Sequence, residues 1–519
     1  MTITIKQLVN CLFLLLFIGS STTVSASMGI DEVINTAVQP LTTVISAVIF
    51  FKVPLFGADF PLVVLWLVAG AIFSTFYFGF INLSGFKHAL ELVRGDYDSP
   101  KDRGEVSHFQ ALATAVSGTV GIGNIGGVAI AISIGGPGAT FWMIVAGILG
   151  MSTKFVECSL ATMYRRENVD GSVSGGPMYY LEKGLTEKGW PGIGKFMGRF
   201  YAIGIVIGCM GIGNMFQSNQ AYVQFVNVTG GADHSWLADK GWLFGSLLAL
   251  LVATVIVGGI KSIARVTEKI VPFMAFFYCA CALVIIAMNY EAIPFAINAI
   301  IDGAFSPDGM SGGAVGVMIV GFQRAVFSNE AGIGSASIAH SAVRTNEPIT
   351  EGYVSVLEPF IDTVVISTLT ALVIVTTFYY DPGFSEGLNG IEMTSSAFER
   401  NLSWSPYTIA IAGILFAFST MISWSYYGLK GWTYLVGESR LADMGFKLVF
   451  CVFVALGCMI QLNAVLDFSD ALVFVICVPN ILGLYILAPV VKRELNSYRQ
   501  RLANGELTNY RRQRAASKK

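Results

Sequence analysis

The stretch SGTVGIGNIGG, residues 117–127, contains three glycines in the pattern G-x-G-x-x-G, at Gly121, Gly123 and Gly126. The pattern is compatible with a nucleotide-binding turn between a strand and a helix, or with a helix that is interrupted inside a membrane. A nucleotide-binding turn requires an acidic residue about 20 residues later, but residues 140–150, TFWMIVAGILG, contain none. The glycines also lie within a long apolar segment. The stretch therefore favours an interrupted membrane helix.

The composition is that of a membrane protein. Of the 519 residues, 54% are hydrophobic and 13% are charged, whereas a soluble domain has about 25% charged residues. Apolar stretches such as 62–81 and 244–260 approach or reach the ~20 residues that cross a ~30 Å hydrocarbon core. We therefore predict an all-α polytopic membrane protein that contacts the lipid bilayer. The formal net charge of −2 argues against a nucleic-acid partner.

The first residues have the pattern of a secretory signal peptide. Lys6 precedes the apolar run 8–18, and small residues follow up to Ala26. We predict a signal peptide over residues 1–27, with a short uncleaved first span as the alternative. Residues 28–58 would then form a periplasmic or interfacial segment, and the mature chain would start outside.

The distribution of positive charge predicts the topology. Lys and Arg cluster at the cytoplasmic ends of spans, and the predicted outer loops 290–313 and 378–404 carry acids with at most one Arg. This bias fits a transporter domain over 59–495 in a bacterial inner membrane, with the N-terminus outside and a basic cytoplasmic tail at 496–519. The eleven predicted spans are about 60–83, 107–133, 139–163, 199–226, 243–260, 270–289, 314–339, 352–377, 405–428, 446–465 and 470–491.

Two predicted spans contain glycine and polar residues in their middle, at 107–133 and 313–338. Their starts are five spans apart, and ten spans remain when the span at 60–83 is set aside. An odd number of spans in each half would insert the second half inverted relative to the first. Interrupted helices at corresponding positions of inverted halves indicate a transporter binding site. We predict a 5+5 inverted repeat preceded by one extra helix.

The first interruption carries Ser117, Thr119 and Asn124 beside its glycines. Small residues also permit close helix packing, but polar groups beside unwound backbone are tolerated where they line a cavity. Amides that are freed at a half-helix N-terminus favour a carboxylate, and freed carbonyls can coordinate a small cation.

Three separated motifs resemble signatures of the alanine or glycine:cation symporter family: VSGTVGIGNIGGVAIAI (116–132), SGGPMYYLEKGL (174–185) and FSNEAGIGSA (327–336). The resemblance extends from about residue 60 to 495. It implies a leucine-transporter-like fold and sodium-coupled uptake of small neutral amino acids. The substrates implied are mainly alanine and glycine, in D as well as L forms in some members.

The resemblance also implies site residues, because VGIGN (120–124) is similar to the unwound first core helix of leucine-transporter-like proteins. The implied residues are Gly121, Ile122 and Gly123 for the substrate carboxylate; the carbonyls of Ser117 and Val120 and the hydroxyls of Ser419 and Thr420 for sodium; and Thr119 and Asn124 for a candidate second sodium. Oxygen ligands of this kind suit a hard cation.

The third core span concentrates amides in GIGNMFQSNQAY (211–222). Gln217 is our candidate for binding the substrate ammonium group, with Asn214 and Gln220 as competitors. Hydrogen bonding between helices is the alternative role for these amides.

The remaining candidate residues border the substrate side chain. Trp424 lies one helical turn after Thr420, and there it would leave room for little more than a methyl group; the alternative is an interfacial Trp. Phe327 and Ser328, at the second interruption, would close over the substrate. Asn124 and Thr420 are expected to border it as well.

Charged residues within spans need partners. Lys154 and Glu157, three apart, can pair on one helix face. Glu358 and Asp362, four apart, would repel unless a cation intervenes. Glu330 and Asp362 are the candidates for proton coupling, although structural pairing is the favoured interpretation for all of these groups.

We therefore predict a monomeric symporter that works by alternating access, with sodium as the co-transported cation. A proton-coupled amino-acid carrier is the first alternative, and a receptor or channel is the second. The eight cysteines and four histidines show no metal-binding spacing. No nucleophile–base–acid set emerges, so neither a bound cofactor nor an enzymatic activity is expected.

Overall fold

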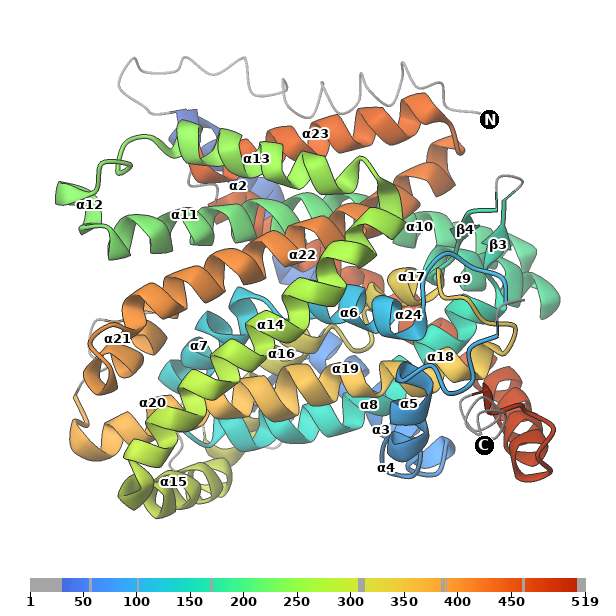
Figure 1. Ribbon diagram of the computed structural model, residues 1–519, viewed down its shortest axis with the longest axis horizontal. Helices are drawn as coiled ribbons and strands as arrows, with labels where there is room; N and C mark the ends of the chain where they lie inside the picture. The colour runs from blue at the N-terminus through green and yellow to red at the C-terminus, as the bar shows by residue number, and fades with distance from the viewer. Residues whose placement is uncertain are drawn as a thin grey trace, which may run out of the picture.

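The computed structural model describes residues 30–55, 58–99, 102–168, 171–306, 313–383, 388, 390–459 and 463–510. Most of these residues are helical (Figure 1). The described strands form two short antiparallel pairs, β1 (Lys52–Leu55) with β2 (Ala58–Pro61) and β3 (Arg166–Glu167) with β4 (Val173–Ser174). The predicted helical class is confirmed for the described residues apart from these pairs, and the predicted signal peptide lies outside them.

Helices are present in every predicted span. The spans that contain one long helix are α3 (Leu62–Tyr77), α8 (Ala139–Met163), α13 (Gly241–Ile256), α14 (Gly259–Met288), α16 (Gly313–Asn329), α22 (Ser405–Val436), α23 (Arg440–Met459) and α24 (Asn463–Ala503). Three other spans consist of several pieces: α6 (His108–Thr119), η1 (Ile122–Asn124) and α7 (Gly126–Gly135); α10 (Pro191–Met210), η2 (Gly211–Met215) and α11 (Phe216–Val228); and α18 (Pro348–Ser355), α19 (Leu357–Pro359), η4 (Phe360–Ser367) and α20 (Thr368–Tyr380). The other described helices are α2 (Ile30–Ile49), α4 (Ile81–Ser84), α5 (Phe86–Val93), α9 (Pro177–Glu187), α12 (Gly231–His234), η3 (Tyr290–Ala292), α15 (Ile293–Phe305), α17 (Ala336–His340) and α21 (Ile391–Asn401).

The number of membrane crossings is smaller when it is counted by length and composition. Seven described helical segments are long and apolar enough to cross a membrane, and the bent pair His108–Thr119 and Ile122–Gly135 would be an eighth. Helices α3 and α13 have 16 residues each, which is fewer than the ~20 of a typical span. The count of eleven stays a prediction.

The predicted interruption at residues 117–127 is confirmed. The two halves of the segment, α6 and η1–α7, are bent by 60° relative to each other. Helix α6 ends where Val120 and Gly121 adopt extended backbone conformations, with ψ of 98° and −156° respectively. Glycine costs about 1 kcal/mol relative to alanine in a helix, so this glycine-rich stretch favours leaving the helix here.

The second predicted interruption is also present. Helix α16 ends at Asn329, and Glu330 adopts the left-handed conformation with φ of 57°. Gly332 and Gly334 follow with φ of 93° and 89° before α17 begins, a conformation that glycine adopts without steric cost. In Figure 1, α6, α7 and α16 lie in the middle of the molecule.

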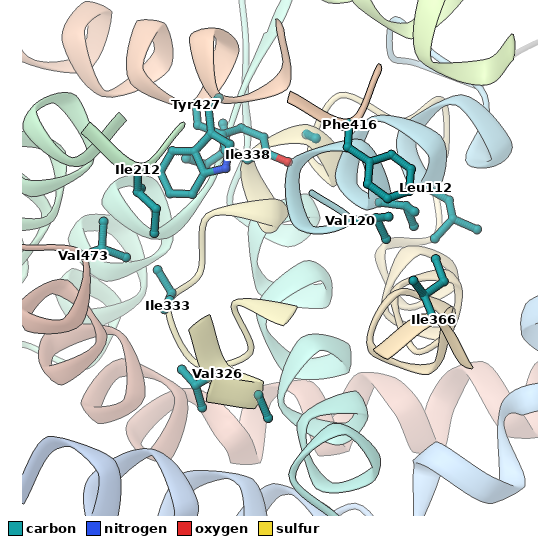
Figure 2. Packing of buried hydrophobic residues seen from close by; sticks show 14 of the residues in the cluster. Leu112, Val120, Ile212, Val326, Ile333, Ile338, Ile366, Phe416, Tyr427 and Val473 are labelled. Carbon is teal, nitrogen blue, oxygen red and sulfur yellow. The ribbon is translucent and has the colours of Figure 1, made fainter. Parts of the chain in front are cut away.

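Buried apolar side chains surround both interruptions. Figure 2 shows Val120 beside the first interruption, Val326 on α16 and Ile333 in the second interruption within one buried cluster. Ile212 on η2 and Phe416 on α22 belong to the same cluster. Polar groups at the interruptions therefore lie in a low-dielectric environment, where hydrogen bonds are stronger and unpaired groups are costly.

Candidate functional site

The side chain of Asn124 joins the two interruptions. Its Oδ1 accepts a hydrogen bond from the amide of Gly121 at 2.9 Å, and its Nδ2 donates to Ser328 Oγ at 3.0 Å. The same Nδ2 lies 2.7 Å from Asp362 Oδ1 and 3.2 Å from Ser367 Oγ. Asn124 is fully buried, so it stabilises the turn and fixes α16 and η4 against it.

Asp362 lies at the centre of this cluster. Its carboxylate accepts hydrogen bonds from Asn124 Nδ2, from Ser328 Oγ at 2.9 Å and from Thr363 Oγ1 at 2.7 Å. It belongs to η4, a π-helical segment, and such segments are frequent at functional sites. The ion pairs among the described residues do not include Asp362. A buried carboxylate with only neutral partners favours a bound cation or a proton.

The sequence predicts Asp362 as a candidate for proton coupling but not as a sodium or substrate ligand. The signal was present, because an acid within an apolar span indicates a functional role by default. Structural pairing with a neighbouring charge was favoured instead, and the structure shows hydroxyl and amide partners at Asp362.

The turn holds the residues predicted to bind the substrate carboxylate. Ile122 and Gly123 form η1 together with Asn124. A Cβ atom added to Gly123 would lie 3.9 Å from Ser328 Cα, so the two interruptions approach each other closely. The structure thus brings the predicted residues Ile122, Gly123, Asn124 and Ser328 together.

Gly121, Gln217 and Thr420 converge from three different segments. A Cβ atom added to Gly121 would lie 3.0 Å from Thr420 Oγ1 and 3.6 Å from Gln217 Oε1. Gln217 Nε2 donates to the carbonyl of Ile212 at 3.1 Å. Its Oε1 is buried and has no hydrogen-bond partner among the described residues. Buried polar atoms are nearly always paired, so this oxygen can accept from a donor that the described residues do not supply.

Trp424 packs beside this convergence point. Its side chain is 1% exposed, and its Nε1–H donates to the carbonyl of Gly118 at 3.2 Å. A Cβ atom added to Gly213 on η2 would clash with the Trp424 ring. The alternative of an interfacial Trp does not agree with this burial.

The predicted sodium ligands on α6 and α22 form a cluster of hydroxyls and carbonyls. Thr420 Oγ1 donates to the carbonyl of Ser117 at 3.0 Å, and Ser117 Oγ contacts Ser423 Oγ. Ser117 Oγ also donates to the carbonyl of Ser419 at 3.1 Å. The Ser419 hydroxyl lies against Met274 Sδ on α14, at 3.6 Å. The hydroxyl that faces Ser117 is instead that of Ser423, one helical turn after Ser419. Ser423 was not among the predicted ligands.

The remaining predicted residues lie apart from these two clusters. Thr119 Oγ1 donates within its own helix, to the carbonyls of Ala115 at 3.4 Å and Val116 at 3.3 Å, so its hydroxyl is not joined to Asn124. Phe327 is half-buried and lines a cleft of about 410 Å³ formed with α2 and α24.

A chain of buried ion pairs connects four segments near the site. Lys154 Nζ lies 2.9 Å from Glu358 Oε1, and Glu358 Oε2 lies 3.6 Å from His340 Nε2. His340 Nδ1 is 2.5 Å from Glu351 Oε1, and Glu351 Oε2 is 2.5 Å from His108 Nδ1. These residues come from α8, α17, α18–α19 and α6, so the chain holds these helices together.

The predicted pair of Lys154 and Glu157 is therefore wrong. Glu157 instead accepts a hydrogen bond from Asn480 Nδ2 on α24 at 2.7 Å. Packing of α8 against α19 places Glu358 beside Lys154, although the two are far apart in the chain. Glu358 thus pairs with Lys154, whereas Asp362 bonds to Asn124, Ser328 and Thr363 and to no cation among the described residues.

Comparisons with known proteins agree with this architecture. The model of the sodium:alanine symporter family matches residues 42–512. The sodium/alanine symporter AgcS of Methanococcus maripaludis is 38% identical over 442 residues, which cover 85% of this chain and 94% of that protein. The probable sodium/glutamine symporter GlnT of Bacillus subtilis is 32% identical over 447 residues, covering 86% and 89%. The crystal structure of MhsT in complex with L-phenylalanine is similar to this structure, with a TM-score of 0.53 and 15% sequence identity. The match covers 74% of this chain and 89% of that chain. This likeness supports the leucine-transporter-like fold.

Proposed function

Because the chain belongs to the sodium:alanine symporter family, we propose that it couples sodium influx to the uptake of small neutral amino acids. Alanine, glycine and D-alanine are the candidate substrates, carried by alternating access across the bacterial inner membrane. The family and its relatives are transporters, so the protein is a membrane transporter and not an enzyme. The carboxylate of Asp362, buried among neutral partners where both helix interruptions meet, carries the proposal of cation coupling.

The convergence of Gly121, Gln217 and Thr420 supports the binding of an amino acid. The amides of the turn would hold the substrate carboxylate, since freed amides at a half-helix N-terminus attract anions. The unpaired Oε1 of Gln217 would accept from the ammonium group. The buried ring of Trp424 would limit the space for the side chain. An amino acid is thus recognised by groups from three segments, namely the turn at Gly121, α11 and α22.

Two groups of oxygen atoms fit a hard cation such as sodium. The first consists of the carbonyls of Ser117, Val120 and Ser419 with the hydroxyls of Thr420 and Ser423; Thr420 and Ser423 both face α6. The hydroxyl of Ser423 takes the role predicted for that of Ser419.

The second oxygen group consists of Asn124, Ser328, Asp362 and Thr363. It would lie beside the substrate carboxylate, because Asn124 also bonds to the amide of Gly121. Asn124 Nδ2 faces this group in the structure, so ligation through Oδ1 would require the amide to turn and to give up the hydrogen bond from Gly121.

The coupling ion can be tested by L-alanine uptake into proteoliposomes that contain the full chain. An inward sodium gradient at fixed pH is expected to drive accumulation, and choline in place of sodium is expected to abolish it. An interior-negative voltage of 100 mV supplies ~2.3 kcal/mol per sodium ion, or about 1.7 decades of accumulation. Equal uptake in choline, with a folded protein, would contradict the proposal.

A proton-coupled carrier is the second candidate function. Glu330 and Asp362 are buried acids whose hydrogen bonds come from Ser335 and from the Asn124 cluster, and either could carry a proton. In the same proteoliposomes, uptake that needs an inward pH gradient and ignores sodium would favour this candidate. Conductance that does not saturate, without counterflow, would indicate a channel.

Thr420→Ala is expected to weaken the apparent sodium affinity about tenfold. The substitution removes one hydroxyl from the first oxygen group, and a hydrogen bond or ligand of this kind contributes about 1.5 kcal/mol. The measurement is the sodium concentration that gives half-maximal alanine uptake. Thr420→Ser, which retains the hydroxyl, is the matched control and should stay near the original value. An unchanged sodium dependence in Thr420→Ala would remove Thr420 from the sodium site.

Trp424→Ala is expected to admit larger amino acids. It removes a buried ring that contacts Gly118 and Gly213, one helical turn after Thr420, so leucine should compete with alanine for uptake in the variant and not in the original protein. Trp424→Phe keeps an aromatic ring and loses the hydrogen bond to Gly118, which separates the volume of the side chain from its polar contact. If a folded Trp424→Ala protein still excludes leucine, Trp424 does not set the size limit.

A further inference from the structure

A basic cleft lies at one end of the molecule, away from the transport site. Its volume is about 570 Å³, and it lies between α9, the first turns of α10 and the end of α22. These elements and β3 meet toward the right-hand end of Figure 1. The charged residues that line it are Arg166, Lys183, Lys195, Arg199, Glu182 and Glu438.

The two acids in the lining are engaged by partners of their own. Glu182 Oε2 accepts a hydrogen bond from the Tyr434 hydroxyl at 2.5 Å, which joins α9 to α22. Glu438 accepts from Ser174 Oγ at 2.5 Å and from Asn168 Nδ2 at 3.0 Å. Both carboxylates therefore stabilise the walls of the cleft.

The four cations in the lining are not neutralised in this way. The ion pairs among the described residues include none of Arg166, Lys183, Lys195 and Arg199. Lys183 Nζ donates to the carbonyl of Tyr164 at 2.8 Å, which holds the ammonium group in place. Burial is the main cause that lowers the pKa of Lys183; the nearby charge of Arg166 also lowers it, and Glu182 and Glu187 act in the opposite direction.

The cleft adjoins a face of α10 that is suited to lipid. Ile193, Phe196, Phe200 and Ile203 are between 38% and 68% exposed, and their spacing of three or four residues places them on one side of the helix. Trp190, just before the helix, is 48% exposed, and Trp is enriched at membrane–water interfaces. Lys195 and Arg199 lie among these residues in the sequence and are exposed as well.

We propose that this cleft binds the headgroup of an anionic phospholipid, whose acyl chains lie along the apolar face of α10. Arginine and lysine supply the charge-assisted hydrogen bonds that a phosphate accepts. Basic pockets between helices on the cytoplasmic side are typical of such sites, and the charge bias of the sequence places these helix ends in the cytoplasm. The exposed apolar face of α10 favours a lipid, because its acyl chains would contact that face. A soluble anion would interact with the charged side chains alone.

The test uses the full chain in a neutral detergent and measures its thermal unfolding during titration with phosphatidylglycerol, with phosphatidylcholine of the same acyl chains, or with inorganic phosphate. Phosphatidylglycerol is expected to raise the unfolding temperature at concentrations where the other two do not. An equal shift with phosphatidylcholine would overturn recognition of charge. An equal shift with phosphate would overturn the assignment to a lipid.

The double substitution Lys195→Gln with Arg199→Gln is expected to weaken the response to phosphatidylglycerol about 30-fold, at ~1 kcal/mol per cation. Lys261→Gln with Arg265→Gln is the matched control, because these exposed cations have the same types and spacing on α14 and do not line the cleft. Equal losses in the two double variants would mean that surface charge alone attracts the lipid. Arg166→Gln, in the β3–β4 pair, tests the same cleft without altering α10, and an unchanged response there and in the first double variant overturns the proposal.

Discussion

Replacing Asp362 by asparagine is expected to weaken the apparent affinity for sodium by about 100- to 1,000-fold. A unit charge about 4 Å from a cation contributes about 4 kcal/mol at an effective dielectric constant of about 20, which corresponds to about three decades of affinity. The substitution Asp362→Asn keeps the shape of the side chain and removes only its charge. The measurement is sodium-dependent alanine uptake, compared at low and at saturating sodium.

The variant should fold, because its neighbours can adapt to an amide. Ser328 and Thr363 bond to the Asp362 carboxylate through hydroxyls, which can act as donors or acceptors. Thr363→Val is the graded comparison within the same oxygen group: it removes one uncharged hydroxyl, which bonds to the Asp362 carboxylate and accepts from Asn329, and the loss of sodium affinity should be about tenfold.

An unchanged sodium dependence in Asp362→Asn would contradict a sodium site at this cluster. If the variant instead loses a response to the pH gradient and keeps its response to sodium, Asp362 carries a proton.

Replacing Lys154 by methionine is expected to destabilise the protein by about 3–5 kcal/mol, the cost of breaking a buried ion pair by removing one partner. Lys154 and Glu358 are both fully buried and 2.9 Å apart. Methionine has a similar length and no charge, so the effect reports the loss of the ammonium partner of Glu358, which keeps only its longer contact with His340, more than a cavity. The measurement is the free energy of unfolding in detergent micelles, together with the yield of folded protein.

A second change should restore part of this loss. Glu358→Gln in the Lys154→Met background removes the carboxylate charge that has lost its lysine partner, and replacing both partners of a buried pair is far less costly than removing one. Glu157→Gln is the matched control, because Glu157 is equally buried on the same helix but bonds to the neutral amide of Asn480. A double variant that is less stable than Lys154→Met, or a loss below about 1 kcal/mol in the single variant, would show that the pair does not hold these helices together.

The two interruptions could be predicted from the sequence because their signal is local. Glycine and polar residues inside apolar segments disfavour a continuous helix wherever the segment packs. The family motifs span the same stretches, so the backbone of the site was predictable before any tertiary contact was known. The structure brings the predicted residues Gln217 and Thr420 close to Gly121, and Trp424 close to Gly118; their roles in binding stay predictions.

The tertiary structure decided which polar groups meet. Lys154 has an acid three residues away in the sequence, yet it pairs with Glu358, because α19 packs against α8 and brings that carboxylate closer. Helical spacing alone favoured Glu157 as the partner. The contacts between helices therefore override the periodicity of a single helix.

The rotation of each helix about its axis decided which way the other polar side chains of the site point. Glu358 and Asp362 would share a face of a regular α-helix, but the π-helical segment η4 begins between them at Phe360, and Asp362 meets Asn124 while Glu358 meets Lys154. Likewise the rotation of α22 turns Ser423 toward α6 and Ser419 toward α14.

The sequence by itself determined the membrane class, the family and the two broken helices, because these depend on composition and local motifs. Only packing decided the partners of the buried charges and hydroxyls, because a side chain's direction depends on helix rotation and local winding, which neighbouring helices set.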